Sequence, residues 1–471
     1  MIPYYNQSKF HNSRPLIFIE ARRNQGETMA ASSRNLGVIV TASLAGLLFG
    51  FDTVVISGVT DSVRHVFHLD PGSFWAGFSV ASGLVGTFIG ALVAGKPGDV
   101  YGSRDALKAV GYLYLVSALG SAFCWNLESF YVFRFIGGLA IGASSVLAPV
   151  YISEIAPAEH RGRLTGLFQF NIVLGILLAF LSNALVQFVA DGSDPWRIKL
   201  GIAAAPALLF IFMMYTIPQS PRWLAQRGRL AEAKESLERV GVQDTSAMLA
   251  EFEHAAADAR AHSAQKLFVA AHRKPIILAI LIATFNQLSG INAILYYLKD
   301  IFAAAGFSGL SNDLQSVAIG AANLIATVIA LRVIDRVGRR KLLLIGSVGT
   351  AIALAGVALI FATGQGKGWL LACLIVFIAF FAFSQGAVIW VYLAEIFPTA
   401  VRSRGQALGS ATHWGMNTII GQAFLMVAVH TQALPFVFFS LCMVVQFFVV
   451  LAMFPETRGV KLESMQETLE R

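Results

Sequence analysis

The chain alternates long apolar segments with short polar loops along almost its whole length, and this alternation constrains its fold more than any other feature. A helix needs about 20 mostly apolar residues to cross the hydrocarbon core of a bilayer, and runs of that length recur here. Backbone polar groups cannot stay unpaired in lipid, so each run must close its own hydrogen bonds as a helix. The sequence therefore predicts an all-α membrane protein.

The composition supports the same class. Hydrophobic residues make up 56% of the chain and charged residues 13%, whereas soluble domains carry about 25% charged residues. The net charge of +8 is spread over short loops, which is typical of membrane topology and not of a nucleic-acid surface. The three cysteines lie in apolar runs, and their number and spacing indicate neither a disulfide framework nor a metal site. We therefore expect a lipid bilayer as a partner, no nucleic acid, no metal and no cofactor.

The apolar segments fall into two groups of six, separated by a polar insert that follows Pro218. Closely spaced Arg, Lys and Glu in the insert, with apolar residues at helical intervals, predict short amphipathic helices. We expect a disordered tail over 1–35, a six-helix half over 36–217, a helical linker over 218–273, a second six-helix half over 274–454 and a cytoplasmic tail over 455–471. The expected spans are 36–58, 75–95, 106–124, 128–151, 164–189, 197–217, 275–305, 313–334, 342–362, 369–393, 405–430 and 433–454.

Loop charges orient the chain in the membrane. The loops after the second, fourth, eighth and tenth spans carry most of the Lys and Arg, and the loops on the opposite side carry few. The positive-inside rule then places these loops, the insert and both termini in the cytoplasm. The first 35 residues lack the apolar core of a secretory signal. We expect a multi-pass, monomeric protein of the plasma or inner membrane.

The two halves repeat each other's loop motifs, with 236, 241 and 237 residues between the copies. Two homologous six-helix halves around a central pathway are a transporter architecture. The repeated pairs are Gly95–Arg104 with 335–341, Glu154-Ile-Ala-Pro with Glu395-Ile-Phe-Pro, and 218–222 with 455–459.

The stretch Asn286–Tyr297 places three amides, a serine and two tyrosines inside the seventh apolar segment. An unpaired amide in hydrocarbon costs several kcal/mol, so these side chains must face protein or a water-filled cavity. If the helix loosens at Ser289-Gly290, Gln287 and Asn292 can face one cavity, as in the broken helices of transporters. Hydrogen bonding between helices is the alternative. The clustering of so many polar groups favours a binding site.

Asp52 and Arg134 lie in the middle of the first and fourth apolar segments, where each ionisable side chain costs about 2.5–3.5 kcal/mol. They form either a structural ion pair or a proton site. Burial favours the neutral Asp, while a nearby Arg favours the charged form. A conformational change that alters their separation would load and release a proton, and we favour this interpretation.

The chain resembles the sugar porter family of the major facilitator superfamily from about residue 36 to residue 465. Several motifs in the family's order make the resemblance specific. The matching motifs are Gly50-Phe51-Asp52-Thr53, Arg134-Phe-Ile-Gly-Gly, Arg161-Gly-Arg, Pro-x-Ser-Pro-Arg-Trp at 218–223, Asn-Gln-Leu-Ser-Gly-Ile-Asn at 286–292 and Pro-Glu-Thr-Arg-Gly at 455–459.

The resemblance implies alternating-access import of a neutral monosaccharide, a hexose or a pentose. Symporters of this family have an Asp–Arg pair at the positions of Asp52 and Arg134, whereas similar uniporters have a neutral residue in place of the Asp. Amides that both donate and accept suit sugar hydroxyls, and flat aromatic rings suit the C–H face of a sugar. Packing between helices is the alternative for Asn286. The expected sugar-site residues are Phe49, Gln169, Asn286, Gln287, Asn292, Tyr296, Trp390, His413 and Trp414.

Duplicated carboxylate and guanidinium groups at the loop ends of the spans resemble the family's cytoplasmic latches, although such groups can also be plain topology charges. Ser103 stands where the second copy has Arg339, and Gln219 replaces the usual Glu, so the prediction rests mainly on the C-terminal half. The Gly-Pro expected before Trp390 is Gly386-Ala387. The expected latch residues are Asp99, Arg104, Glu154, Arg163, Asp335, Arg339, Arg340, Glu395 and Arg402.

Other functions fit the sequence less well. No nucleotide-binding loop or nucleophile–base constellation is present, which argues against an ATP-driven pump and against an enzyme. A uniporter, with Asp52 as a structural partner, remains the nearest alternative to a proton symporter. A transport-inactive sensor would be expected to have a long signalling extension, and a drug antiporter would have fewer amides in its cavity.

Overall fold

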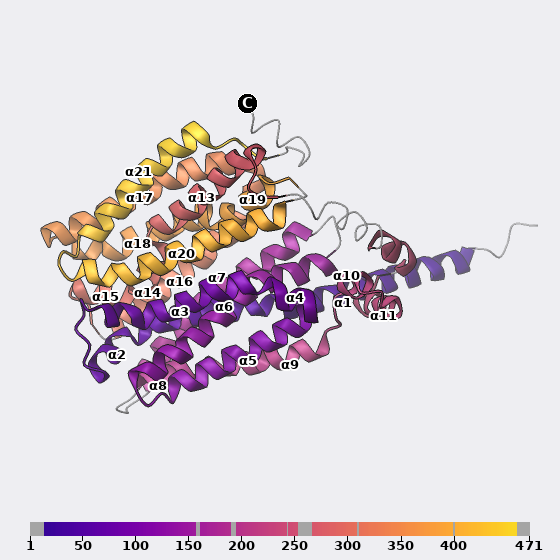
Figure 1. Ribbon diagram of the computed structural model, residues 1–471, viewed down its shortest axis with the longest axis horizontal. Helices are drawn as coiled ribbons and strands as arrows, with labels where there is room; N and C mark the ends of the chain where they lie inside the picture. Colours follow the sequence, from indigo (N-terminus) through magenta and orange to yellow (C-terminus); the bar gives the residue numbers. More distant parts are fainter. Residues whose placement is uncertain are drawn as a thin grey trace, which may run out of the picture.

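The computed structural model describes residues 14–156, 161–189, 195–242, 244–252, 266–308, 310–398 and 401–458. Within these ranges the side chains of residues 14–34, 161–163, 165, 310, 335 and 403 are outside the description. All regular elements of the described ranges are helical. The helices run roughly along one direction and form two layers, one from each half of the chain (Figure 1).

The N-terminal half contains six spans, and the last of them is built from two helices. Side-chain caps fix two of the starts: Ser73 accepts from the Ala76 N–H, and Asn126 forms a reciprocal capping box with Ser129. The helix of the first span begins at Arg14, and its apolar part begins at Asn35. The spans are α1 (Arg14–Val55), α3 (Phe74–Val93), α5 (Ser103–Ala122), α6 (Leu127–Ile155), α7 (Arg161–Val189) and α8 (Pro195–Gly201) with α9 (Ala204–Thr216).

The C-terminal half contains six further spans, two of which are broken. The seventh consists of α13 (Arg273–Leu288), α14 (Ile291–Tyr296) and α15 (Leu298–Ala304). The tenth consists of α18 (Leu370–Phe381), a π-helical turn (Ala382–Gly386) and α19 (Ala387–Glu395). The others are α16 (Leu310–Val337), α17 (Arg339–Thr363), α20 (Arg402–Ala428) and α21 (Leu434–Met453).

Ten of these twelve spans are long and apolar enough to cross a membrane on length and composition alone. The two exceptions are α5 and α20. The first turns of α5 carry Arg104, Asp105 and Lys108, and α20 carries His413 and Asn417 in the protein interior. Both helices are polar because they contribute to charged or buried polar sites. The twelve-helix architecture in two halves is the one predicted from the sequence.

The halves meet along α3 with α20 and along α7 with α16. At the end of the bundle that carries α2 (Thr60–Val66) and α15, polar contacts join them. Arg64 and Thr60 of α2 both bind the carboxylate of Asp300 in α15, and Gln422 of α20 donates to the Phe74 carbonyl at 2.9 Å. Hydrogen bonds and an ion pair therefore join the two halves at the end that carries α2 and α15.

The insert lies at the opposite end of the bundle, beside α4 (Gly95–Tyr101), and we call this the insert end (Figure 1). Its described helices include α10 (Pro221–Gln226) and α11 (Leu230–Val240). The buried face of α11 packs through Ala233 and Leu237 against α10. Tyr151 donates to the Pro218 carbonyl at 2.6 Å, and Ser236 donates to the Gln219 carbonyl. These contacts attach the insert to the N-terminal half.

Candidate functional site

The seventh span breaks where the sequence predicts that it loosens. α13 ends at Leu288, and Gly290 has a φ of +81°, a left-handed conformation that favours glycine. The Ser289 hydroxyl donates to the Asn286 carbonyl at 2.7 Å and accepts from the Ile291 N–H at 3.3 Å. A side chain at position 290 would also collide with the ring of Phe439 in α21. The break is therefore held both by local hydrogen bonds and by packing.

The break brings the predicted amides together. Gln287 Nε2 donates to Asn286 Oδ1 at 3.2 Å and lies 3.1 Å from a ring nitrogen of His413. Asn292 Nδ2 donates to Gln287 Oε1 at 3.1 Å, so residues on either side of the break share one network. Gln287 is 1% exposed and Asn286 is 3% exposed. Their hydrogen bonds offset the cost of burying amides inside a membrane bundle.

Aromatic rings flank this network from both halves of the chain. Trp390 and Trp414 each contact the His413 ring, with ring centroids 5.1 and 5.0 Å apart. Phe49 of α1 lies 5.6 Å from the Trp414 ring and 6.4 Å from the Phe168 ring. Trp414 Nε1 is buried and has no hydrogen-bond acceptor among the described residues. The aromatic surface therefore includes a donor that the described part of the protein does not use.

Two predicted residues, Tyr296 and Gln169, occupy different environments. The Tyr296 hydroxyl pairs with the Asn417 amide, at 3.0 Å from Nδ2 and 3.3 Å from Oδ1, and both residues are buried. Gln169 is half-buried on α7 next to Phe168, whose ring packs on Phe49. Asn417 was missed by the sequence analysis. It lies four residues after His413 on one helix, and this helical spacing was the signal that could have identified it.

Asp52 and Arg134 form a buried ion pair between α1 and α6. Arg134 Nη1 lies 3.0 Å from Asp52 Oδ1, and the two side chains are 5% and 6% exposed. Arg134 Nη2 also donates to the Asp52 carbonyl at 3.4 Å. Asp52 Oδ2 and Arg134 Nε are buried without a hydrogen-bond partner in the described structure. The pair is therefore only partly satisfied.

One small cavity connects this ion pair with the aromatic residues. Its volume is about 10 Å³, which is room for about one water molecule. Arg134 and Thr53 line it from the N-terminal half, and Tyr296 and Trp414 line it from the C-terminal half. The buried guanidinium and the polar aromatic site thus face the same space.

At the insert end of the C-terminal half, the predicted latch residues form a charged network. Arg339 makes two hydrogen bonds to Glu395, at 2.9 and 3.2 Å, and Thr457 donates to the same carboxylate at 2.6 Å. Glu456 caps the start of α17 by accepting from the N–H groups of Arg339 and Arg340 at 2.8 and 3.1 Å. A carboxylate at a helix N-terminus is favourable because it compensates the helix dipole.

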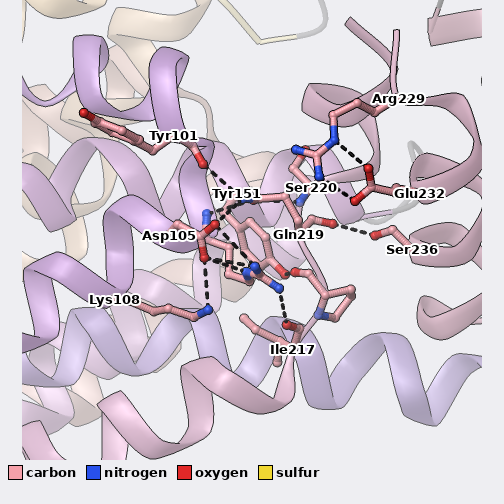
Figure 2. Close-up of polar contacts among 12 residues, drawn as sticks. Tyr101, Asp105, Lys108, Tyr151, Ile217, Gln219, Ser220, Arg229, Glu232 and Ser236 are labelled. Carbon is pink, nitrogen blue, oxygen red and sulfur yellow. Dashed lines mark hydrogen bonds and ion pairs between the residues drawn. The ribbon is translucent and has the colours of Figure 1, made fainter. Parts of the chain in front are cut away.

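The same position in the N-terminal half carries a network built around the neutral amide of Gln219. Gln219 Oε1 accepts from the Arg104 N–H at 3.2 Å, and its Nε2 donates to Tyr101 O and Asp105 Oδ2, both at 3.1 Å (Figure 2). Arg104 pairs with its neighbour Asp105 at 3.0 Å. Glu154 receives a hydrogen bond from the Ser103 hydroxyl at 3.3 Å.

The remaining predicted latch residues have other surroundings. The main-chain carbonyl of Asp99 accepts from Trp223 Nε1 at 2.9 Å and from Arg227 at 2.6 Å, which binds the insert to α4. Arg402 Nε donates to the Phe397 carbonyl at 3.4 Å. The side chains of Arg163 and Asp335 lie outside the description.

Comparison with known proteins places these features in a family. The family model described as "Sugar (and other) transporter" matches residues 38–469. The D-xylose-proton symporter of Escherichia coli is 32% identical, with 94% of this chain and 97% of that protein covered. The arabinose-proton symporter of Bacillus subtilis is 33% identical, with coverage of 92% and 96%.

Solved structures of the Escherichia coli xylose transporter XylE have the same fold. Its partially occluded inward-open conformation matches with a TM-score of 0.82 at 31% identity, covering 91% of this chain and all of that one. The proton:xylose symporter XylE bound to 6-bromo-6-deoxy-D-glucose matches with a TM-score of 0.79 at 32% identity, covering 93% and 99%. On its motifs, its two six-span halves and these similarities, the chain belongs to the sugar transporter family of the major facilitator superfamily, whose members are transporters and not enzymes.

Proposed function

We propose that this protein is a secondary transporter that imports a monosaccharide together with a proton by alternating access. The observation that carries the proposal is the cavity lined jointly by Arg134, Tyr296 and Trp414. The guanidinium that holds Asp52 therefore shares a cavity with Tyr296 and Trp414, aromatic side chains suited to a sugar. The relatives named for D-xylose–proton and arabinose–proton symport support this assignment.

Coupling follows from the incomplete pairing of Asp52. Arg134 favours the carboxylate, whereas burial favours the protonated acid, so a small change in their separation shifts the balance between the two. Because α1 and α6 carry the pair within one half, coupling requires that sugar binding near Arg134 and Trp414 shifts these two helices against each other. One charge carried through 100 mV is worth about 2.3 kcal/mol, which can drive accumulation of a neutral sugar.

The Asp52→Asn variant in proteoliposomes tests the coupling. The amide keeps the shape and one acceptor but cannot titrate, so we expect sugar exchange down its own gradient to survive. Accumulation of D-xylose driven by an acidic exterior should be lost. If the variant still concentrates the sugar, Asp52 does not carry the proton. If exchange falls together with thermal stability, the pair is structural, and a uniporter becomes the better interpretation.

For the sugar ligands we propose the residues predicted from the sequence, namely Phe49, Gln169, Asn286, Gln287, Asn292, Tyr296, Trp390, His413 and Trp414. The support is the shared amide network and the buried Trp414 Nε1 that has no acceptor among the described residues. Each lost hydroxyl hydrogen bond is worth about 0.5–1.5 kcal/mol, so Gln287→Ala and Asn292→Ala should raise the sugar dissociation constant several-fold. Calorimetry in detergent measures this. Unchanged affinity in both variants would move the site elsewhere.

We propose that the insert end lies in the cytoplasm and that its charged networks act as latches that close the sugar path there. We also propose that the protein acts as a monomer in the bilayer of the cell membrane. The loop charges support this orientation. Glu235 is exposed on α11, so Glu235→Cys in a background without Cys124, Cys373 and Cys442 reports its side. We expect no labelling by an impermeant thiol reagent in intact cells and full labelling after permeabilisation. Labelling in intact cells would reverse the orientation.

A further inference from the structure

The last helix, α21, carries an amide that none of the site residues described above contacts. Gln446 is 2% exposed within a helix made largely of Phe, Val, Leu and Met. Side chains of this kind are expensive inside a membrane bundle unless they are hydrogen-bonded, and they mark functional positions. Gln446 does not line the central cavity. Any effect that it has on the site must therefore pass through other residues.

The partner of Gln446 lies in the π-helical turn of the tenth span. Gln385 Nε2 donates to Gln446 Oε1 at 2.9 Å and also approaches Met443 Sδ at 3.1 Å. Gln385 is 2% exposed. Single π turns within α-helices occur frequently at functional sites because they redirect side chains and carbonyl groups. This turn lies directly before the helix that carries Trp390.

A chain of hydrogen bonds leads from this turn into the amide cluster. Asn286 Nδ2 donates to the main-chain carbonyl of Gln385 at 3.4 Å, and Asn286 Oδ1 accepts from Gln287 at 3.2 Å. Gln287 in turn accepts from Asn292 at 3.1 Å. The chain therefore runs from α21 through the π turn to both sides of the break in the seventh span.

The same face of α21 also packs on that break. Phe439, Met443 and Gln446 follow one another at helical spacing, and each is at most 3% exposed. The Phe439 ring fills the space beside Gly290 that a Cβ would need. This face therefore supports the π turn with a hydrogen bond and the helix break with an aromatic ring.

We propose that Gln446 is a positioning residue for sugar recognition, acting through Gln385 to orient Asn286 and Gln287. This inference rests on the proposed function of that amide cluster. A sugar hydroxyl both donates and accepts, so an amide recognises it only when its oxygen and nitrogen point in a defined direction. An amide can turn over at little covalent cost, and its direction is held by the hydrogen bonds of the next layer.

Uptake and counterflow of D-xylose in proteoliposomes test the proposal. Gln446→Met keeps the length of the side chain but removes the oxygen that accepts from Gln385. We expect KM to rise about 3- to 10-fold with Vmax unchanged, the equivalent of one hydrogen bond. Gln446→Glu retains an acceptor oxygen and should restore most of the affinity. Ser440→Ala is the matched control, because Ser440 lies on the same helix and donates to Ala351 in α17.

If Gln446→Met folds poorly, a second variant removes the other partner of the Gln385–Gln446 hydrogen bond. Gln385→Met removes the donor and should raise KM to a similar extent, and the two changes combined should add little to either alone. An unchanged KM in both variants, or a loss of Vmax and thermal stability at constant KM, would overturn the positioning role. Counterflow requires no proton, so failure of symport in the wild-type protein is recognised separately from failure of this inference.

Discussion

The two halves of the protein build the same capping motif at the insert end with different chemistry. In each half a glycine with positive φ, Gly102 or Gly338, precedes a span, and a side chain from beyond the sixth span of that half caps the helix start. The C-terminal half uses the carboxylate of Glu456, and the N-terminal half uses the neutral amide of Gln219.

The difference extends to the neighbouring carboxylates. Glu395 binds the guanidinium of Arg339, whereas Glu154 accepts from hydroxyl groups, among them that of Ser103, which stands in the arginine's place. Duplication therefore conserved the backbone arrangement, and the side chains set how strongly each half is held together. The C-terminal motif holds a largely buried ion pair of Arg339 with Glu395. The N-terminal motif uses the neutral amide of Gln219, and its ion pair of Arg104 with Asp105 is more exposed.

The largest expected difference in the free energy of unfolding is between variants of Arg339 and of Arg104. Arg339→Leu leaves Glu395 without its guanidinium in a site where the two side chains are 9% and 23% exposed. We expect a loss of up to about 3 kcal/mol in the free energy of unfolding, the lower end for breaking a buried pair. Arg104→Leu should lose about 0–1 kcal/mol, because its partner Asp105 is 40% exposed. Denaturant titration in mild detergent measures both.

The control for this comparison is the double change Arg339→Leu with Glu395→Leu. Two apolar residues leave no unpaired charge, so the double variant should be more stable than Arg339→Leu alone. Equal losses for Arg104→Leu and Arg339→Leu would show that the two halves do not differ in their dependence on charge.

The next largest change in the free energy of unfolding is expected when the capping residues Gln219 and Glu456 exchange their chemistry. Gln219→Glu removes the two N–H donors to Tyr101 and Asp105 and places a second carboxylate beside Asp105. We expect a loss of about 1–3 kcal/mol from the unpaired acceptors, with part of it recovered at acidic pH as the two carboxylates share a proton. The reverse change, Glu456→Gln, should lose about 0.3–1 kcal/mol, the value of a charge at a helix terminus. A greater loss for Glu456→Gln than for Gln219→Glu would contradict the distinction between the caps.

The smallest change in the free energy of unfolding is expected for a variant of Glu154. In Glu154→Gln the amide oxygen can still accept from Ser103, so the free energy of unfolding should change by no more than about 0.5 kcal/mol. The matched change, Glu395→Gln, should cost about 1.5–3 kcal/mol because it weakens hydrogen bonds to a charged group. Thermal melts of both variants in one detergent provide the comparison, and a large loss for Glu154→Gln would show that its charge interacts strongly with the nearby Arg222.

Features readable along the chain were enough to predict the class of fold and the kind of site. Apolar runs can only be helices in lipid, and the repeated loop motifs required two equivalent halves. The cost of polar groups in hydrocarbon singled out Asp52, Arg134 and the stretch Asn286–Tyr297, and Gly290 marked the helix break. These inferences depend on local composition and on spacing along one chain, which the sequence contains in full.

The packing of the helices determines which of these groups meet. The contact of Phe49 with Trp414 and the hydrogen bonds of Gln287 with His413 and of Tyr296 with Asn417 join residues that lie more than one hundred positions apart. The hydrogen bonds from Gln446 through Gln385 to Asn286 depend on the π turn, and an apolar run in the sequence does not predict such a turn. A helix pattern shows which face of a segment is polar, but the partner of that face depends on how the spans pack, and packing is settled by the shapes of all of them together.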